Sequence, residues 1–489
     1  MSSDQSFIKR AMSRSFLYGA SNLFGKAIGL IMLPIYTRYL TPADYGIASF
    51  LLLYIALVQI VLGVKLESAI SKFYYDKDID HSLNKIITTA NCLTAIACVI
   101  PVILSIIFSD SISNMLFGTA EHGDLVAILA GSILFGTLEL YNMQYIRIKD
   151  KAFIYLSISL FGLILQLLIN IVFIVFLEMG VVGVIVSNVA ASFLKWALSG
   201  VIFLWMEGLP HFERTLVKPL FRFCAPLWMS GIFGLYAGSS HQVFINYFSE
   251  LSDLGLYNLG ATLASIMATL VFGPFWAFWQ VERFKIKAEP NALLKFRNIY
   301  LFLLGIGCVM SIGISSYGPL IIELMADNAF HPASKVVAIL CVSICYTYLA
   351  TYAGFSFLVT GNTKEIARTS IYNAAVTTIL LAILVPFYGF LGASIAVMLS
   401  SMFNFYYVNF RSRLFFDMQL PILLTTITMS STLIASVLLY FLYIFLDSPV
   451  RYFIIASTLN SAVLLSIIFR LKRHYPDTFL LLLTKIKLA

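Results

Sequence analysis

Charged residues are scarce in this chain. Asp, Glu, Lys and Arg together make up only 11% of its 489 residues, whereas hydrophobic residues make up 60% and the mean hydropathy is +0.90. Soluble domains carry roughly a quarter charged residues, because their surface faces water. A soluble fold is therefore excluded, and most of the surface of this chain must face lipid.

The sequence also lacks the common motifs for nucleotide binding, metal binding and nucleophilic catalysis. The chain has no glycine-rich loop ending in lysine for nucleotide phosphates, no His/Glu spacing for a metal and no nucleophile elbow. All of its cysteines lie inside apolar segments, where buried small hydrophobic residues are expected rather than disulfides or metal ligands. They are Cys92, Cys98, Cys224, Cys308, Cys341 and Cys345. The sequence therefore predicts no cofactor, no metal ion and no catalytic residue, as in a protein that is not an enzyme.

Long connections are also absent. No stretch between successive apolar windows exceeds about twenty residues, which is near the ordinary length of a connection between elements. This leaves no room for a folded domain outside the membrane. Any function must therefore be built from the spanning helices themselves.

What the sequence does contain is a series of long apolar windows. Fourteen of them are long enough for helices that cross about 30 Å of hydrocarbon. They cover residues 16–39, 43–65, 86–108, 123–146, 153–177, 180–205, 220–247, 254–280, 298–318, 333–359, 367–387, 389–410, 419–446 and 450–470. The turns at 178–180 and 388–389 are so tight that either one could conceal a re-entrant segment. The first window is too long for a signal-peptide core and no cleavage site follows it, so we expect it to remain as the first span.

Basic residues gather on one side of these spans. With the N-terminus in the cytoplasm, 27 of the 32 Lys and Arg residues fall in cytoplasmic segments, and only Arg38, Lys335 and Arg451 fall on the opposite side. This distribution obeys the positive-inside rule, so both termini are predicted to be cytoplasmic. The net charge of +8 is then a topology signal, and nucleic acid is not an expected partner.

An internal repeat relates the two halves of the chain. A shift of 209 residues superposes sterically important positions over a long stretch. Ser21, Phe24, Gly25, Gly29, Asp44, Gly46, Gly180 and Gly183 fall on Ser230, Phe233, Gly234, Gly238, Asp253, Gly255, Gly389 and Gly392. Six spans per copy is an even number, so both copies insert with the same orientation. We therefore predict an all-α membrane protein with two parallel six-helix lobes, 1–206 and 207–413, followed by two extra helices and a cytoplasmic tail in 414–489.

The sequence resembles a known transporter family around its first two spans. Residues 33–46 read LPIYTRYLTPADYG within a pattern that begins at Asn22, and residues 67–75 read ESAISKFYY. These stretches resemble the polysaccharide-unit flippases (Wzx-type), the polysaccharide transport branch of the multidrug/oligosaccharidyl-lipid/polysaccharide (MOP) exporter superfamily. The best-matched positions, which look mainly structural, are Pro34, Arg38, Pro42, Asp44 and Gly46.

The resemblance implies a function, a location and partners. A flippase of this family carries undecaprenyl-diphosphate-linked oligosaccharide from the cytoplasmic to the periplasmic leaflet by alternating access, for O-antigen, capsule or exopolysaccharide synthesis. It has a central, usually cationic cavity between V-shaped lobes. It lies in the bacterial inner membrane among membrane lipids, and the polymerase and chain-length proteins of the same pathway are candidate partners.

Other functions remain open at this stage. The same fold could export a lipid-linked peptidoglycan precursor or a cationic drug, although a drug exporter should carry acids rather than lysine at mid-membrane. A membrane polysaccharide polymerase or ligase needs sizeable periplasmic loops with catalytic groups, which this chain lacks. A scaffold for a synthesis complex would explain neither the repeat nor a lysine inside the first span.

That lysine is Lys26, near the middle of the first span, where a charge costs at least a few kcal/mol. It either faces a wet cavity and meets the diphosphate or an acidic sugar, or it forms a structural ion pair. Glu139 is the clearest intramembrane acid for such a pair, and it could pair with either Lys26 or Lys195 or instead bind a coupling proton. Asn22 lies one turn before Lys26 and could line the same cavity.

Three further polar residues are candidates for the cavity wall. Lys195 either lines the cavity or extends its aliphatic stem to the interface. His241 stands in a polar run that suits sugar hydroxyls or proton exchange, and Gln59 lies near the middle of the second span. Hydrogen bonding between helices explains both nearly as well.

Charges near the span ends form the last group. Lys65, Lys72 and Arg283 would lie at the cytoplasmic mouth of a cavity, either attracting a diphosphate or serving as ordinary topology charges. Arg38 ends the best-matched motif on the acidic side, where we expect it to pair with Asp44.

Overall fold

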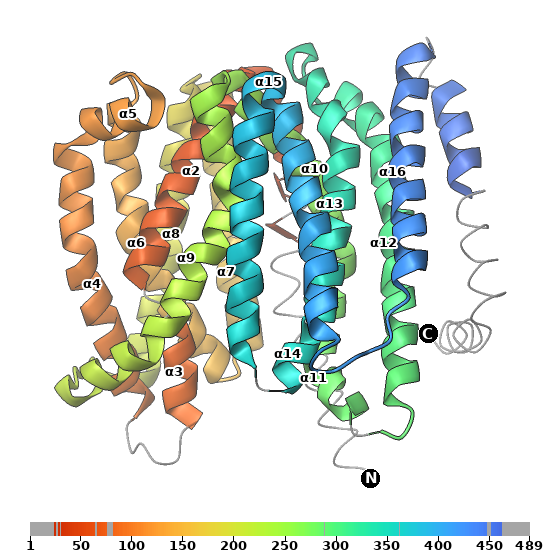
Figure 1. Cartoon of the computed structure of the whole chain (residues 1–489). Coiled ribbons are helices and arrows are strands. Elements are labelled where there is room, and N and C mark those ends of the chain that lie inside the picture. Colours follow the sequence, from red (N-terminus) through yellow and green to blue (C-terminus); the bar gives the residue numbers. More distant parts are fainter. Residues whose placement is uncertain are drawn as a thin grey trace. The chain divides into compact units, whose positions relative to one another are not determined.

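The computed structural model describes residues 24–25, 28–29, 31–63, 66–75, 82–287, 289–360, 362–446 and 451–461. Every element within these ranges is a helix (Figure 1). Ten of the helices are long and apolar enough to cross a membrane. The prediction of an all-α polytopic membrane protein is therefore confirmed.

Contacts divide the chain into two compact units, 1–255 and 256–489. Residues 31–39 of the first unit are helical. Its later elements are α2 (Pro42–Gly63), α3 (Leu66–Tyr75), α4 (Leu83–Ile107), α5 (Ser109–Phe117), α6 (Gly123–Ile148), α7 (Ala152–Ile171) with its π-helical end η1 (Val172–Phe176), α8 (Gly180–Glu207), the 3-10 turn η2 (Arg214–Leu216) and α9 (Val217–Phe248).

The second unit follows the first turn of α10. Its elements are the rest of α10 (Leu251–Met267), the π-helical η3 (Ala268–Phe272), α11 (Gly273–Lys287), α12 (Ala292–Met325), the 3-10 turn η4 (Asn328–Ala333), α13 (Ser334–Ala353), α14 (Phe355–Val359), α15 (Thr363–Ser412) and α16 (Ile422–Phe445). Residues 451–461 are also helical.

The predicted spans coincide with these helices. Windows two to six fall on α2, α4, α6, α7 and α8, and windows seven to ten fall on α9, on α10 with α11, on α12 and on α13. Windows eleven and twelve share α15, and window thirteen is α16. Much of the first and the last window lies outside the described residues. Fourteen spans are thus compatible with the structure, while the lobe boundaries at 206 and 413 stay predictions.

The short helices α3 and α5 were not among the predicted elements, because a search for long apolar windows does not detect them. α3 is amphipathic, and it buries Leu66, Ile70 and Phe73 against α4 and α6. It therefore holds its place by packing one apolar face, as surface helices of globular proteins do.

Both tight turns join full-length neighbouring helices rather than concealing re-entrant segments. Gly180 and Gly389, which are 209 residues apart, have φ values of +54° and +52°. A Cβ on Gly183 would press on the end of the preceding helix at Phe173, and one on Gly392 would overlap the Leu384 carbonyl oxygen. A glycine with positive φ, followed three residues later by a glycine packed closely against the preceding helix, thus recurs 209 residues further along the chain.

At Gly389 the chain reverses within α15, giving two antiparallel segments. An ion pair of 2.8 Å between Arg411 and Glu365 joins the last turn to the first. Figure 1 shows the two segments side by side, joined at the end labelled α15. Windows eleven and twelve are therefore a helical hairpin.

Gly389→Ala is expected to lower the stability of this hairpin by about 1–3 kcal/mol, because φ 52° with ψ −135° is strained for any residue with a Cβ. Thermal unfolding of the purified protein in detergent measures the loss. The matched control is Gly313→Ala in α12, where the added Cβ meets nothing within 4 Å. An equal midpoint for the two variants would contradict the prediction.

Candidate functional site

A polar seam runs between α6 and α8 inside the first unit. The Ser132 hydroxyl donates to Asn188 Oδ1 at 3.2 Å, and further along the same helices Lys195 Nζ lies 3.0 Å from Glu139 Oε1. Both pairs are separated by 56 residues, as expected for two parallel helices in constant register. Residues 132, 136 and 139 recur every three or four positions, so they share one face of α6.

Gln59 reaches this seam from α2. Its Nε2 donates to the Ser132 carbonyl at 2.8 Å. A Cβ at position 136 would lie 2.5 Å from that Nε2 and 4.0 Å from the Ser192 hydroxyl, so a larger residue there would require the Gln59 amide to shift. The structure thus brings Gln59 within about one helical turn of the Glu139–Lys195 pair.

The ion pair itself is largely shielded. The side chains of Glu139 and Lys195 are 13% and 26% exposed. The stem of Lys195 lies on Gly162 of α7, where a Cβ would come within 2.5 Å of Lys195 Cγ. The structure therefore shows Glu139 in an ion pair, which is one of its two predicted roles. Residues of α6, α7 and α8 meet at this pair.

A second group of polar contacts lies one turn further along α6. Asn91 Nδ2 donates to Asn142 Oδ1 at 3.0 Å. The Tyr141 hydroxyl donates to the Gly63 carbonyl and accepts from Thr94, each at 3.0 Å. Sequence reasoning missed these residues, because Asn, Thr and Tyr are common in membrane spans, although their helical spacing from Glu139 was a usable signal.

His241 lies on α9, in a polar run that contacts α5 rather than the polar residues between α6 and α8. Asn246 Nδ2 donates to the Leu116 carbonyl at the end of α5, and Ser240 is 2% exposed. The structure therefore places the outer part of α9 against α5. The cavity role of His241 stays a prediction.

The other predicted site residues are described only in part. Arg283 of α11 lies in the second unit, and its guanidinium stands over the Phe355 ring at 5.1 Å. Lys72 belongs to α3, and only its backbone is described. Asn22, Lys26 and Lys65 lie outside the described residues.

The best-matched motif builds the start of α2. Asp44 Oδ2 accepts from the backbone N–H of Thr41 at 2.9 Å and from its hydroxyl at 2.7 Å, while the Asp44 N–H donates back to that hydroxyl. This reciprocal pairing is a capping box, and Pro42 occupies the first helical position. The ion pair that we expected between Arg38 and Asp44 is not formed between these two described residues, because the carboxylate caps the helix instead. Arg38 is exposed.

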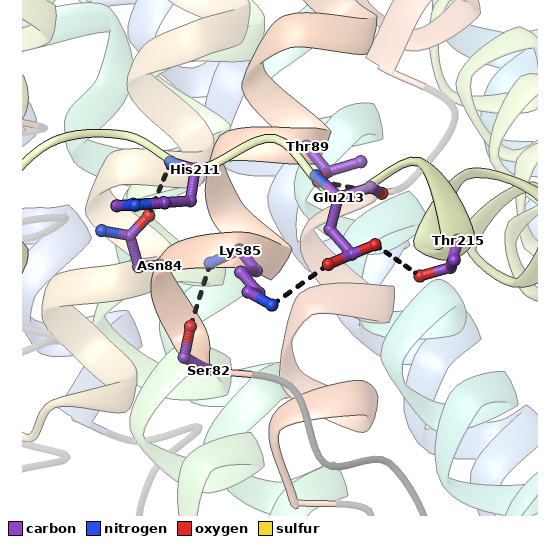
Figure 2. Close-up of polar contacts among 7 residues, drawn as sticks. All are labelled: Ser82, Asn84, Lys85, Thr89, His211, Glu213 and Thr215. Atoms are coloured by element: carbon purple, nitrogen blue, oxygen red, sulfur yellow. Dashed lines mark hydrogen bonds and ion pairs between the residues drawn. The ribbon is translucent and has the colours of Figure 1, made fainter.

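The connection between α8 and α9 is tied to the start of α4 (Figure 2). Asn84 Nδ2 donates to the carbonyls of Glu207 and Leu209, and its Oδ1 accepts from the His211 N–H. Glu213 is bound by the Thr215 hydroxyl and by Lys85 Nζ, and these bonds hold the pKa of that carboxyl below its ordinary value. Residues 207–213 are therefore fixed by side chains of one helix.

Part of the sequence matches the model of a known protein family. Residues 35–277 match a family model described as polysaccharide biosynthesis protein. The resemblance expected from residues 22–75 is thereby confirmed by a match that extends well beyond them.

One curated relative is the Lsg locus putative protein 1 of Haemophilus influenzae, 25% identical over 265 residues. The alignment covers 53% of this chain and 62% of that protein. The match therefore spans less than two thirds of the relative.

Two solved structures share the fold. A lipid II flippase MurJ in an inward closed conformation superposes with a TM-score of 0.75 at 15% identity, covering 94% of this chain and 99% of that one. An inward-facing MATE family transporter of the MOP superfamily gives a TM-score of 0.63 at 15% identity over 80% of this chain and 94% of the other. At this identity the likeness shows the fold alone, which this chain shares with both structures.

Proposed function

Since this chain is a multi-pass membrane protein with the MOP-superfamily fold and a polysaccharide biosynthesis match over residues 35–277, we propose that it is a lipid-linked oligosaccharide flippase. Its cargo is an oligosaccharide unit on undecaprenyl diphosphate. It moves this unit from the cytoplasmic to the periplasmic leaflet of the bacterial inner membrane by alternating access, with both termini in the cytoplasm. The match to a polysaccharide family on an exporter fold is the observation that carries the proposal.

The polar groups inside the membrane-spanning helices suit such a cargo. A diphosphate needs cations, and Lys26 is the residue that we assign to it, since a charge at mid-membrane normally serves a wet site or a partner. The amides of Gln59 and Asn188 and the hydroxyl of Ser192 suit sugar hydroxyls, which both donate and accept. The Glu139–Lys195 pair carries no net charge. It therefore adds polarity to the lining of the proposed cavity without repelling an anion.

Deletion of the gene is expected to remove surface polymer and to leave the undecaprenyl-diphosphate-linked unit in the cytoplasmic leaflet. Extraction and mass spectrometry measure the accumulated lipid-linked intermediate, and its protection in intact spheroplasts from a sugar-modifying reagent that does not cross the membrane shows that it lies in the cytoplasmic leaflet. A polymerase defect would instead leave single units on the periplasmic side. Accumulation of the lipid-linked peptidoglycan precursor would instead indicate lipid II transport, the activity named for the MurJ structure.

Complementation then tests the assigned cation. Lys26→Ala is expected to abolish export while the protein stays in the membrane, whereas Lys335→Ala, at an exposed position outside the proposed cavity, serves as the control. Normal surface polymer with Lys26→Ala would refute the role of Lys26, while a deletion strain without accumulated intermediate would refute the flippase itself.

A further inference from the structure

The surface that α13 exposes is polar rather than apolar. All residues of this helix, Ser334–Ala353, are described, and the exposed ones are Lys335 at its start and Thr347 and Thr351 further along. Spanning helices that face lipid expose apolar side chains, as α16 does with Leu423 at 75% exposure. The exposed part of α13 is therefore suited to a polar ligand rather than to lipid.

The two threonine hydroxyls lie on successive turns of one helix face and can accept hydrogen bonds from a ligand. Thr347 Oγ1 donates to the Ser343 carbonyl at 3.0 Å, and Thr351 Oγ1 donates to the Thr347 carbonyl at 2.8 Å. A hydroxyl has one proton and two lone pairs, so donation to the helix backbone leaves its oxygen as an acceptor. Ligands that carry many hydroxyl donors fit such a pair.

Two partly exposed aromatic rings accompany these threonines. Tyr348 follows Thr347 on α13, and its ring centroid lies 6.2 Å from that of Trp276 of α11, with 29° between the ring planes. The fully buried Phe272 stacks on Tyr348 at 4.0 Å and 9°. One face of the Tyr348 ring is therefore covered from within the second unit, and its exposed part lies on the other face and the edge.

A π-helix and a glycine position these rings. Phe272 ends η3, the π-helical segment between α10 and α11, and π-helical turns are frequent at functional sites. Gly307 of α12 leaves room for this ring, since a Cβ there would lie 3.5 Å from Phe272 Cζ and 3.0 Å from Cys345 Sγ. Tyr348 thus rests on a close-packed support, so little side-chain freedom is lost when a ligand meets it.

The internal repeat shows how the two units differ at these positions. Tyr348 is 209 residues after Glu139, the acid of the ion pair between α6 and α8. The same shift pairs the residues of the first unit Gln59, Glu139 and Lys195 with Ala268, Tyr348 and Asn404. The first unit therefore carries charges and an amide where the second carries an uncharged aromatic ring. The two units suit chemically different parts of a ligand.

We propose that Trp276, Tyr348 and the hydroxyls of Thr347 and Thr351 form a carbohydrate-binding platform in the second unit. A pyranose ring has an apolar face of C–H groups, which the negative face of an aromatic ring attracts, while the sugar hydroxyls bond at the rim. None of the four side chains is charged, so the platform binds the sugar and leaves the diphosphate to other residues. The proposal rests on the proposed function for the identity of the cargo.

The test measures sugar binding without lipid or diphosphate. The probe is the repeat-unit oligosaccharide released by partial acid hydrolysis from the surface polysaccharide of the cells that produce this protein. Saturation-transfer-difference NMR with the purified full-length protein in detergent shows which sugar protons approach it. The wild-type protein is expected to give signals from the C–H protons of one sugar face, and the absence of any signal would overturn the proposal.

Variants of the platform then test its parts. Trp276→Leu and Tyr348→Leu are each expected to weaken binding about fivefold or more, as truncation of aromatic anchors does in other interfaces. Tyr348→Phe keeps the ring and is expected to bind nearly as well as wild type. Thr351→Val keeps the shape of the side chain at an exposed position, so the protein is expected to fold normally and to bind the sugar several-fold more weakly.

The matched control is Trp279→Leu, since Trp279 belongs to the same helix and stacks on Tyr352 but is fully buried. It is expected to lower the unfolding midpoint, while the protein that stays folded binds the probe as wild type does. Trp205→Leu removes an 81% exposed tryptophan from α8 and is expected to leave binding unchanged. If Trp276→Leu and Tyr348→Leu bind as tightly as these two controls, the rings serve packing only and the proposal fails.

The result is separable from that for the flippase. Binding that depends on Trp276 and Tyr348, together with a deletion strain that accumulates no lipid-linked intermediate, would uphold the platform and refute the flippase. Accumulated intermediate together with unchanged binding by the two leucine variants would uphold the flippase and refute the platform.

Discussion

Lys195→Met is expected to destabilise the protein by about 2–3 kcal/mol and to abolish export. Methionine keeps the stem on Gly162 but removes the ammonium 3.0 Å from Glu139, so a carboxylate that is only 13% exposed loses its partner. Breaking a fully buried pair costs about 3–5 kcal/mol, and the 26% exposure of Lys195 reduces that figure. Thermal unfolding in detergent and surface-polymer analysis measure the two effects.

The double variant separates structure from transport. Glu139→Gln with Lys195→Met leaves no unpaired charge, so most of the lost stability is expected to return, as it does when buried ion pairs are replaced by uncharged side chains. Export is expected to stay low, because the lining of the proposed cavity next to Gln59 has lost both of its charged groups. Recovery of both stability and export would mean that the pair only holds α6 and α8 together.

The spans were predictable from sequence because length and apolarity are properties of a stretch taken by itself. α2, α4, α6 and α8 therefore lie where the hydropathy placed them. The short helices α3 and α5 depend on packing one face against neighbours, which a linear search does not register. Gly180 and Gly389 were visible as a repeat, yet only the backbone shows that both residues have a positive φ.

The sequence indicated which polar residues belong to the candidate site, but not which of them form bonds with one another. Gln59, Glu139 and Lys195 stood out because polar groups in apolar spans are costly. Which lysine Glu139 binds depends on the register of α6 and α8, and the offset of 56 residues between Ser132 and Asn188 appears only when the helices are packed. The capping of α2 by Asp44 depends only on residues close in sequence. The Asp44 carboxylate accepts from the Thr41 N–H, so it does not pair with Arg38 as we had predicted.

Asn84→Asp is expected to be the most damaging substitution at the connection between α8 and α9 (Figure 2). Asn84 is 6% exposed, and both protons of its amide are used, by Glu207 O at 3.0 Å and by Leu209 O at 3.1 Å. Aspartate has nearly the same shape but turns those two bonds into contacts between oxygens. Buried acceptors left without donors cost about 1–3 kcal/mol each, and more beside a charge.

Asn84→Ala provides the comparison, since it leaves the two carbonyls and the His211 N–H unsatisfied but introduces no repulsion. The expected order of unfolding midpoints is therefore wild type, then Asn84→Ala, then Asn84→Asp. Limited proteolysis should cut both variants earlier within 208–213, the segment that Asn84 and Thr89 hold against α4. If Asn84→Asp unfolded at the wild-type midpoint, the connection would be held by Thr89 and the Lys85–Glu213 pair instead, and Asn84 would be no anchor.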